Sequence, residues 1–255
     1  MTDPLKNIQI VLVRPTRPGN IGGAARAIKN MGLSKLVLVQ PVDPLSSDSY
    51  TMAYGAHDVL ETAKVFKTLP QALARSRYVI GTTARTHKGY GKPSPLMTAA
   101  EDILARAKKQ RVAILFGPES SGLANDEIAL CQSLVTIPTG KTHTSLNLAQ
   151  AVMVVAYELM RATVSNPKPV SAVRRRTINT DQRERFYQEL KDLLMLIGFV
   201  KGTQGTHIQA DLRRIFSRAD LDGRELRILR GIIRQARWAL IHKQPVCISN
   251  TKAIR

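Results

Sequence analysis

The chain has 255 residues, 44% of them hydrophobic, which is enough for one well-packed core and a smaller second unit. Its 38 lysines and arginines outnumber its 19 aspartates and glutamates, and the formal net charge of +19 indicates a polyanionic partner. No apolar run approaches the roughly 18 residues of a membrane-spanning helix, and the opening MTDPLKNIQI carries no signal-peptide pattern, so we expect a cytoplasmic protein that binds nucleic acid and no membrane.

Short apolar runs rich in β-branched residues alternate with helical patterns up to about residue 163. This alternation is typical of an α/β domain with a parallel sheet, which we place at residues 1–165. The strand candidates are almost continuously apolar, as strands covered on both faces are. They lie at residues 8–13, 35–40, 78–83, 111–117 and 133–138. Apolar spacing of three and four predicts helices at residues 21–32, 69–77, 96–110 and 145–162.

The last of these helices, residues 145–162, is apolar around most of its circumference. Such a helix is either packed deeply within its own domain or lies in a subunit interface. Both interpretations stay open at this point.

Residues 166–180 contain two prolines, small polar residues and three consecutive arginines, which predict a linker. Residues 181–255 show three amphipathic helical patterns and no strand alternation, so we expect a small all-α unit. Residues 166–255 contain 19 Lys and Arg but 8 Asp and Glu, and this excess of positive charge favours RNA binding over merely solvated helix faces. The arginines that we expect to contact RNA in this region are Arg174, Arg175, Arg176, Arg213 and Arg214.

A glycine-rich turn, RPTRPGNIGGAARA, follows the first predicted strand and leads into a helix whose N-terminal amides suit an anion. Its spacing is not the G-x-G-x-x-G of a dinucleotide site, and the second strand ends in Gln40 and Pro41 instead of a ribose-binding acid. Arg14, Arg17 and Arg26 favour a phosphate or ribose substrate at this turn. For the glycines, a tight turn that only allows close helix packing is the alternative.

Familiar hydrolase and metal motifs are absent: the sequence has no G-x-S-x-G elbow, no H-E-x-x-H helix and no Walker loop. The two cysteines, Cys131 and Cys247, lie far apart and indicate neither a disulfide framework nor paired zinc ligands. We expect no metal, so the chemistry must depend on positioning and electrostatics.

Three segments occur in a fixed order: GNIGGAARAIKNMG at 19–32, ILFGPESSGL at 114–123 and IPTGKTHTSLNLAQAV at 137–152. Together with GTTAR at 81–85, they resemble the motifs of the TrmH-like SPOUT methyltransferases over residues 8–163. The basic helical tail resembles the TrmJ branch of that superfamily. The resemblance implies a parallel-sheet α/β domain with a C-terminal trefoil knot, followed by an RNA-binding helical domain.

The same resemblance implies an activity. The chain is expected to use S-adenosyl-L-methionine (AdoMet) to methylate the ribose 2′-hydroxyl of a cytidine or uridine in tRNA, at position 32 of the anticodon loop. It is expected to act as a homodimer, which would bury the apolar helix at 145–162. An rRNA 2′-O-methyltransferase of the same fold and a non-catalytic RNA-binding protein are the alternatives.

Three strand-end loops hold AdoMet by this resemblance, and short side chains there let backbone groups approach adenine and ribose closely. The cofactor-binding residues that it implies are Thr82, Thr83, Ala84, Gly117, Ile137, Thr144, Ser145 and Leu146. The catalytic residues that it implies are Asn20, Arg26, Glu119, Ser145 and Asn147. Pro118 departs from the family pattern, because many members carry an arginine there, and this removes one RNA contact.

Each catalytic residue is expected to position a reactant or another residue. Arg26 clamps the phosphate beside the reacting ribose, since a guanidinium that stays charged is a poor base. Glu119 fixes Asn20 or Arg26 through charge-assisted hydrogen bonds. Ser145 and Asn147 present polar groups to the ribose or cofactor, and Ser145 can also serve as a helix N-cap. The structural alternatives are a polar helix start for Asn147 and a solvent-facing loop acid for Glu119.

Overall fold

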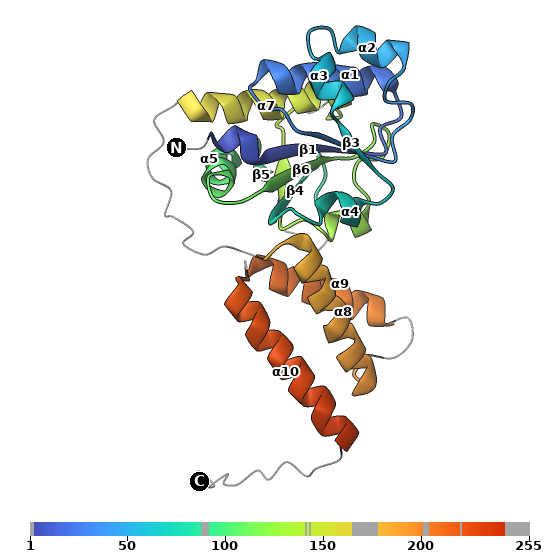
Figure 1. Ribbon diagram of the computed structural model, residues 1–255, viewed down its shortest axis with the longest axis vertical. Helices are drawn as coiled ribbons and strands as arrows, with labels where there is room; N and C mark the ends of the chain where they lie inside the picture. The colour runs from blue at the N-terminus through green and yellow to red at the C-terminus, as the bar shows by residue number, and fades with distance from the viewer. Residues whose placement is uncertain are drawn as a thin grey trace.

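The computed structural model describes residues 3–87, 92–140, 142, 144–164, 178–200, 204–219 and 221–242. Arg174, Arg175, Arg176 and Cys247 lie outside the described residues. The described part of the chain forms a layered α/β unit followed by three further helices (Figure 1).

A seven-stranded sheet forms the centre of the first unit, and all its strand pairs are parallel. The strand order is β3-β2-β1-β6-β4-β7-β5. The five predicted strands are confirmed as β1 (Ile8–Val13), β2 (Leu36–Val39), β4 (Tyr78–Thr82), β6 (Val112–Phe116) and β7 (Ser133–Thr136). The edge strands β3 (Lys64–Phe66) and β5 (Ser94–Pro95) were not predicted, because short, exposed strands lack the continuous apolar run that marks the others.

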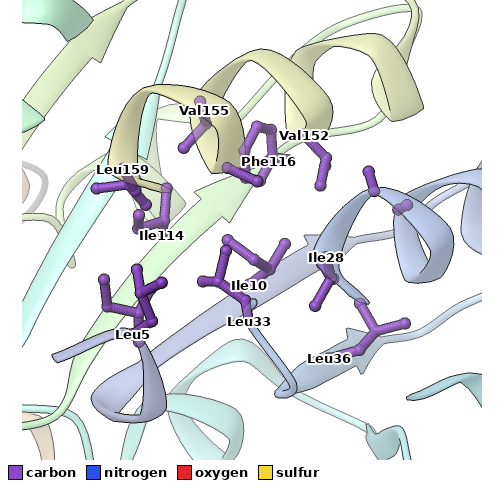
Figure 2. Packing of buried hydrophobic residues seen from close by; sticks show 14 of the residues in the cluster. Leu5, Ile10, Ile28, Leu33, Leu36, Ile114, Phe116, Val152, Val155 and Leu159 are labelled. Atoms are coloured by element: carbon purple, nitrogen blue, oxygen red, sulfur yellow. The ribbon is translucent and has the colours of Figure 1, made fainter. Parts of the chain in front are cut away.

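One face of the sheet carries the larger hydrophobic core. Inward side chains of β1 and β6, such as Ile10 and Phe116, pack against Ile28, Val152 and Leu159 (Figure 2). Ile28 belongs to α1 (Pro18–Asn30), and Val152 and Leu159 belong to α7 (Leu148–Val164). A third helix, α5 (Leu96–Ala107), covers the same face with residues such as Ile103. The three helices were predicted, and burial of their apolar stripes against the sheet is the main force that holds them.

The opposite face carries a second core, built from the alternate residues of the same strands. Val11 and Leu115 point to this face and pack with Leu73 and Ile128. Those side chains belong to α4 (Leu69–Leu73) and α6 (Asn125–Ile128). Burial on both faces explains why β1 and β6 are continuously apolar. The remaining short helices are η1 (Pro4–Asn7), α2 (Ser47–Met52) and α3 (His57–Glu61).

Helix α7 lies beside α1 on one face of the sheet (Figure 1). It buries Val152, Val155 and Leu159, which confirms that it packs deeply within its own domain. Its outer side nevertheless exposes apolar surface, since Tyr157 is 47% and Val164 is 79% exposed. A subunit interface on that outer side therefore stays open.

The second unit is all α-helical, as predicted. Its helices are α8 (Thr180–Leu196), α9 (Gln204–Arg218) and α10 (Gly223–His242). They share a small core that includes Phe186, Tyr187, Leu226 and Ile233, with the rings of Phe186 and Phe216 in an edge-to-face contact at 5.0 Å.

The start of α8 is attached to the sheet domain through backbone groups near α4. Thr180 donates to the carbonyl oxygen of Ser76 from its N–H at 2.8 Å and from its hydroxyl at 3.1 Å. Arg183 donates to the carbonyl oxygen of Arg77 at 3.2 Å. Thr180 is buried, as is Ile178, so the last residues of the predicted linker are packed rather than exposed.

Candidate functional site

The loops that follow β4, β6 and β7 line a cavity of about 510 Å³. β4 pairs with β6 on one side and with β7 on the other, so these parallel strands bring their following loops to one edge of the sheet. The volume lies in the range of small-molecule sites, about 300–1,000 Å³. The cavity is lined by all eight predicted cofactor residues, namely Thr82, Thr83, Ala84, Gly117, Ile137, Thr144, Ser145 and Leu146.

Gly117 begins the loop after β6, and only glycine fits at this position. A Cβ atom there would lie 2.1 Å from the carbonyl carbon of Gly122. Gly122 has φ +69° and donates its N–H to the carbonyl oxygen of Pro118 at 2.8 Å, which closes a tight turn. The turn thus brings main-chain groups to the cavity wall with no side chain at residue 117.

Short hydrogen bonds order the loop after β4. The hydroxyl of Thr82 donates to the carbonyl oxygen of Leu115 at 2.8 Å. The hydroxyl oxygen of Thr83 accepts from the N–H of Arg85 at 3.0 Å and lies 2.9 Å from Nε2 of His87. Arg85 and His87 also line the cavity, although the sequence analysis does not select them. Their place at the end of and just after the GTTAR motif is the signal that could have found them.

The loop after β7 leads into α7, and Asn147 rather than Ser145 caps that helix. The side-chain oxygen of Asn147 accepts from the N–H groups of Ala149 at 3.0 Å and Gln150 at 3.3 Å. The interpretation of Ser145 as the N-cap is therefore wrong. Ser145 is exposed and lines the cavity instead.

A chain of hydrogen bonds joins three of the predicted catalytic residues. Asn20 donates from Nδ2 to Oε1 of Glu119, and Asn147 donates from Nδ2 to Oδ1 of Asn20 at 2.9 Å. The second carboxylate oxygen of Glu119 accepts from the hydroxyl of Thr16 at 2.8 Å. Glu119 therefore holds Asn20, one of the two partners expected for it, and it also lines the cavity.

The hydrogen bonds around Glu119 set its charge state. Burial raises the pKa of this carboxyl, but the hydrogen bonds from Asn20, from its own backbone N–H and from Thr16 together outweigh burial. Its pKa consequently lies below the ordinary value, and the group is a charged acceptor at neutral pH.

Arg26 stands apart from this network. It is exposed on α1 and does not line the cavity. Its guanidinium carbon lies 5.9 Å from the ring centroid of Tyr54, a cation–π contact, and Tyr54 is 73% exposed. None of the ion pairs among the described residues involves Arg26. Its guanidinium is thus available to an external anion.

The other two arginines of the glycine-rich turn have different surroundings. Arg14, which has φ +47° after β1, forms an ion pair with Glu127. The hydrogen bond that Arg14 donates to Glu127 raises the pKa of Arg14 above its ordinary value, despite some burial. Arg17 is exposed just before α1. An RNA phosphate would therefore reach Arg17 more easily than Arg14.

Two arginines predicted to contact RNA in the helical unit are engaged within the protein. Arg213 donates to both carboxylate oxygens of Glu184, at 2.6 and 2.7 Å, and its guanidinium carbon lies 4.5 Å from the ring centroid of Tyr187. Arg214 pairs with Asp211. Their roles in RNA binding stay predictions, and phosphates would have to compete with these carboxylates.

Two further observations concern metal binding and membrane crossing. No group of three or more His, Cys, Asp or Glu side chains suited to a metal ion occurs among the described residues. Within the same residues, no helix combines the length and apolar character needed to cross a membrane.

Comparison with known proteins identifies the family. A family model described as the SpoU rRNA Methylase family matches residues 7–157, and one described as the tRNA methyltransferase TrmJ, C-terminal domain, matches residues 181–245. The tRNA (cytidine/uridine/adenosine-2′-O-)-methyltransferase TrmJ of Pseudomonas aeruginosa (strain UCBPP-PA14) is 40% identical over 245 residues, covering 90% of this chain and 93% of its own. The chain belongs to the TrmJ family.

One solved structure agrees with this TrmJ assignment, and a more distant one shares the fold of the sheet domain. The crystal structure of TrmJ from Z. mobilis ZM4 has a TM-score of 0.78 and 34% identity, and it covers 90% of this chain and 98% of its own. The SpoU methyltransferase AviRb from Streptomyces viridochromogenes, crystallised with the cofactor AdoMet, has a TM-score of 0.50 and 23% identity, over 62% of this chain and 61% of its own. The predicted fold, a parallel-sheet SPOUT domain followed by a helical unit, is confirmed.

Proposed function

We propose that this TrmJ-family chain transfers a methyl group from AdoMet to the ribose 2′-hydroxyl of a cytidine or uridine in tRNA. The observation that carries the proposal is the cavity formed by the loops after β4, β6 and β7, with the charged Glu119 network in its wall. Relatives named as tRNA 2′-O-methyltransferases match nearly the whole chain, which supports the same activity here.

The cavity suits AdoMet in size and lining. Gly117 leaves main-chain groups uncovered, while Ile137, Leu146 and Phe116 supply apolar surface for an adenine ring. We assign the eight predicted loop residues to cofactor binding on this basis. When bound, AdoMet supplies an electrophilic methyl group on a sulfonium, so no metal is required for the transfer.

The protein's own residues then position the acceptor. Glu119 and Asn147 hold the Asn20 side chain from two sides, which fixes the N-terminal turn of α1 next to the cavity. Ser145 lies at the cavity with its hydroxyl available to a ribose. Correct orientation of a weak nucleophile can supply much of the barrier reduction that such a reaction needs.

Arg26 serves as the phosphate clamp in this proposal. Its unpaired, exposed guanidinium suits bidentate binding of a phosphate oxygen pair. It stays protonated at any physiological pH, so it binds and orients the nucleotide rather than accepting the hydroxyl proton. In this proposal the 2′-hydroxyl loses its proton with the assistance of the phosphate that Arg26 holds. Arg17, exposed immediately before the start of α1 and nine positions before Arg26, is a second phosphate contact.

The helical unit favours tRNA over rRNA as the substrate. The family model that matches residues 181–245 is described as a TrmJ C-terminal domain, whereas the model for residues 7–157 carries an rRNA description. We propose that residues 181–255 form the RNA-binding domain, with 166–180 as the linker and 1–165 as the catalytic domain. The target we propose is position 32 of the anticodon loop, reached in the cytoplasm.

We also propose a homodimer and a trefoil knot. The outer side of α7 exposes Tyr157 and Val164, which is apolar surface that a second subunit would cover. The family resemblance supports the knot. In the structure, α7 follows β7, which lies next to the edge strand β5, and α7 packs beside α1. Light scattering that shows a monomer at micromolar concentration would contradict the dimer.

A methylation assay tests the activity. Purified protein is incubated with labelled AdoMet and either tRNA or rRNA, and the methylated ribose is mapped. We expect label in tRNA cytidine or uridine at position 32, and tRNAs with adenosine there are included because the P. aeruginosa relative is named for adenosine too. Label in rRNA alone would favour the rRNA alternative. AdoMet binding by calorimetry without any turnover would favour a non-catalytic RNA-binding protein.

A further inference from the structure

Helix α10 carries a basic and aromatic stripe on the side away from the core of the helical unit. Leu226 and Ile233 face that core and are buried. At 3.6 residues per turn, the opposite side collects six residues spaced as i, i+3, i+7, i+10, i+14 and i+18. These six residues, here called the α10 stripe, are Arg224, Arg227, Gly231, Arg234, Trp238 and His242.

The guanidinium groups of the α10 stripe are exposed, and within the described part of the chain none of them forms an ion pair with an acidic side chain. Arg224, Arg227 and Arg234 take part in none of the ion pairs among the described residues. Arg230, outside the stripe, is by contrast bound to Glu189 of α8. The charges that face solvent are thus left uncompensated, which favours an anionic partner.

An aromatic pair stands at the C-terminal end of the stripe. The indole of Trp238 and the imidazole of His242 are stacked, with centroids 4.9 Å apart and planes at 22°. The imidazole is held by Nδ1, 3.0 Å from the carbonyl oxygen of Trp238. Trp238 is still 43% exposed, so a large part of a flat aromatic surface faces solvent beside Arg234. Stacked rings next to cations are suited to a ligand that is both anionic and aromatic.

We propose that the α10 stripe is a subsite for unpaired RNA, in which Trp238 stacks on a nucleobase and the three arginines hold the phosphates leading to it. This subsite rests on the proposed RNA substrate. It adds which surface of the helical unit binds that RNA and through which contacts. A base within a duplex is covered by its neighbours, so the stacked base comes from a loop or an end. From Arg224 to Trp238 the stripe spans about 21 Å at 1.5 Å per residue, which is long enough to follow several nucleotides.

Other partners fit the stripe less well. A second copy of this chain would bring the same three arginines together across a two-fold axis, where like charges repel. A membrane surface would favour a broad, continuous apolar face. Exposed apolar side chains of α10 such as Ile232 and Ile241 lie outside the stripe, where Trp238 is the only large apolar side chain among three arginines. Unpaired RNA matches both the positive charge of the three arginines and the exposed aromatic surface of Trp238.

Fluorescence tests the stacking directly, because Trp238 is the only tryptophan in the chain. The full-length protein is titrated with a single-stranded oligouridylate and with an abasic ribose-phosphate of equal length. We expect quenching of tryptophan emission by the first and little by the second. Saturating tRNA binding without a change in Trp238 emission would overturn the proposal, as would equal quenching by an acidic peptide or by anionic vesicles.

Variants separate the stacking from the charge. Trp238→Ala is expected to weaken tRNA binding by roughly 5- to 100-fold with an unchanged salt dependence, since stacking involves no counterion release. Trp238→Phe keeps an aromatic face and should recover most of the affinity. The triple variant Arg224→Gln, Arg227→Gln, Arg234→Gln should reduce the slope of log affinity against log salt by about 2 to 3, at roughly 0.7–0.9 per phosphate contact.

Arg237→Gln is the matched control, because Arg237 is an exposed arginine on the flank of the same helix, outside the stripe. It should leave both affinity and salt slope nearly unchanged. If Trp238→Ala binds tRNA like the wild type while the wild type methylates tRNA, the subsite is wrong and the proposed function stands. If the wild type neither binds nor methylates any tRNA, the proposed function itself fails.

Discussion

Asn147 donates a hydrogen bond of 2.9 Å to the side-chain oxygen of Asn20, across 127 positions of the chain. The same Asn147 accepts the first N–H groups of α7 through its own side-chain oxygen. One amide therefore both starts α7 and fixes the N-terminal turn of α1. Since Asn20 in turn donates to Glu119, the loops after β6 and β7 are tied to α1 and α7, two of the three helices that cover the larger core.

Substitutions at Asn147 should separate its two roles. Asn147→Ala removes the cap and the bond to Asn20, and we expect a loss of about 0.5–2 kcal/mol in unfolding free energy together with strongly reduced methylation. Asn147→Ser keeps a capping oxygen but is too short to reach Asn20. It should recover the stability and not the activity, as measured by thermal unfolding and a methylation assay. Equal activity of the serine variant and the wild type would remove the bond to Asn20 from the mechanism.

Glu119→Gln should reduce methylation by roughly 10- to 100-fold, since hydrogen bonds to a charged acceptor contribute about 1.5–3 kcal/mol. AdoMet affinity, followed by calorimetry, should change little. Asp126→Asn is the control, because that acid is exposed at the start of α6. A Glu119→Gln enzyme with normal turnover would contradict the positioning role.

The pH dependence of stability should also report on Glu119. Its pKa is lowered in the folded protein, so its contribution is fully present above the unfolded pKa and is lost as pH falls through the folded pKa. The difference in unfolding free energy between wild type and Glu119→Gln should thus be constant near neutrality and shrink below about pH 4. Denaturant unfolding at a series of pH values measures it. A difference that grew on acidification would mean that the pKa is raised instead.

Gly117→Ala should disturb the cofactor loop. The new Cβ would lie 2.1 Å from the carbonyl carbon of Gly122, so the turn must move and the cavity wall with it. We expect AdoMet affinity to fall at least tenfold by calorimetry. Gly140→Ala adds the same atom where nothing lies within 4 Å, and it should bind AdoMet normally. Normal AdoMet binding by both variants would show that the loop after β6 is not part of the cofactor site.

Arg26→Ala should abolish methylation while AdoMet affinity stays nearly intact, because Arg26 does not line the cavity and is assigned to the nucleotide phosphate. Lys29→Ala, one turn further along α1, removes a positive charge that is paired with Asp58 and should have little effect. Single-turnover methylation and calorimetry give the two readouts. Wild-type turnover by Arg26→Ala would exclude the phosphate clamp.

Removing residues 166–255 should weaken tRNA binding strongly, and the remaining binding should depend less on salt, because most of the excess positive charge is lost with them. The truncated protein should still bind AdoMet, since the cavity lies within residues 82–151. Circular dichroism checks that the sheet domain is folded. Unchanged tRNA affinity of a folded truncated protein would mean that the helical unit has another role.

The resemblance to the family's motifs, more than the physical properties of the individual residues, predicted which loops bind the cofactor. Periodicity and apolar runs predict a parallel sheet, and parallel strands predict a site at their carboxyl ends. They do not by themselves distinguish Thr82 and Thr83 from an ordinary strand terminus. The ordered motifs made that distinction, and their residues do line one cavity. Arg85 and His87 were not predicted, because neither belongs to the cofactor residues that the motifs imply, although both follow β4 as Thr82 and Thr83 do.

The sequence by itself determined the five central strands and the longer helices, but not the short edge strands β3 and β5. Continuous apolar runs such as residues 112–116, bounded by polar residues and glycine, predict strands buried on both faces, and the amphipathic runs after residue 181 predict helices that share one small core, since burial of apolar surface stabilises both. Tertiary structure alone decided which polar groups meet. Glu119 lies 99 positions from Asn20, and Arg213 lies 29 positions from Glu184, which already occupies its guanidinium. Hydrogen bonds and ion pairs act over a few ångströms in space, so no local pattern along the chain records them.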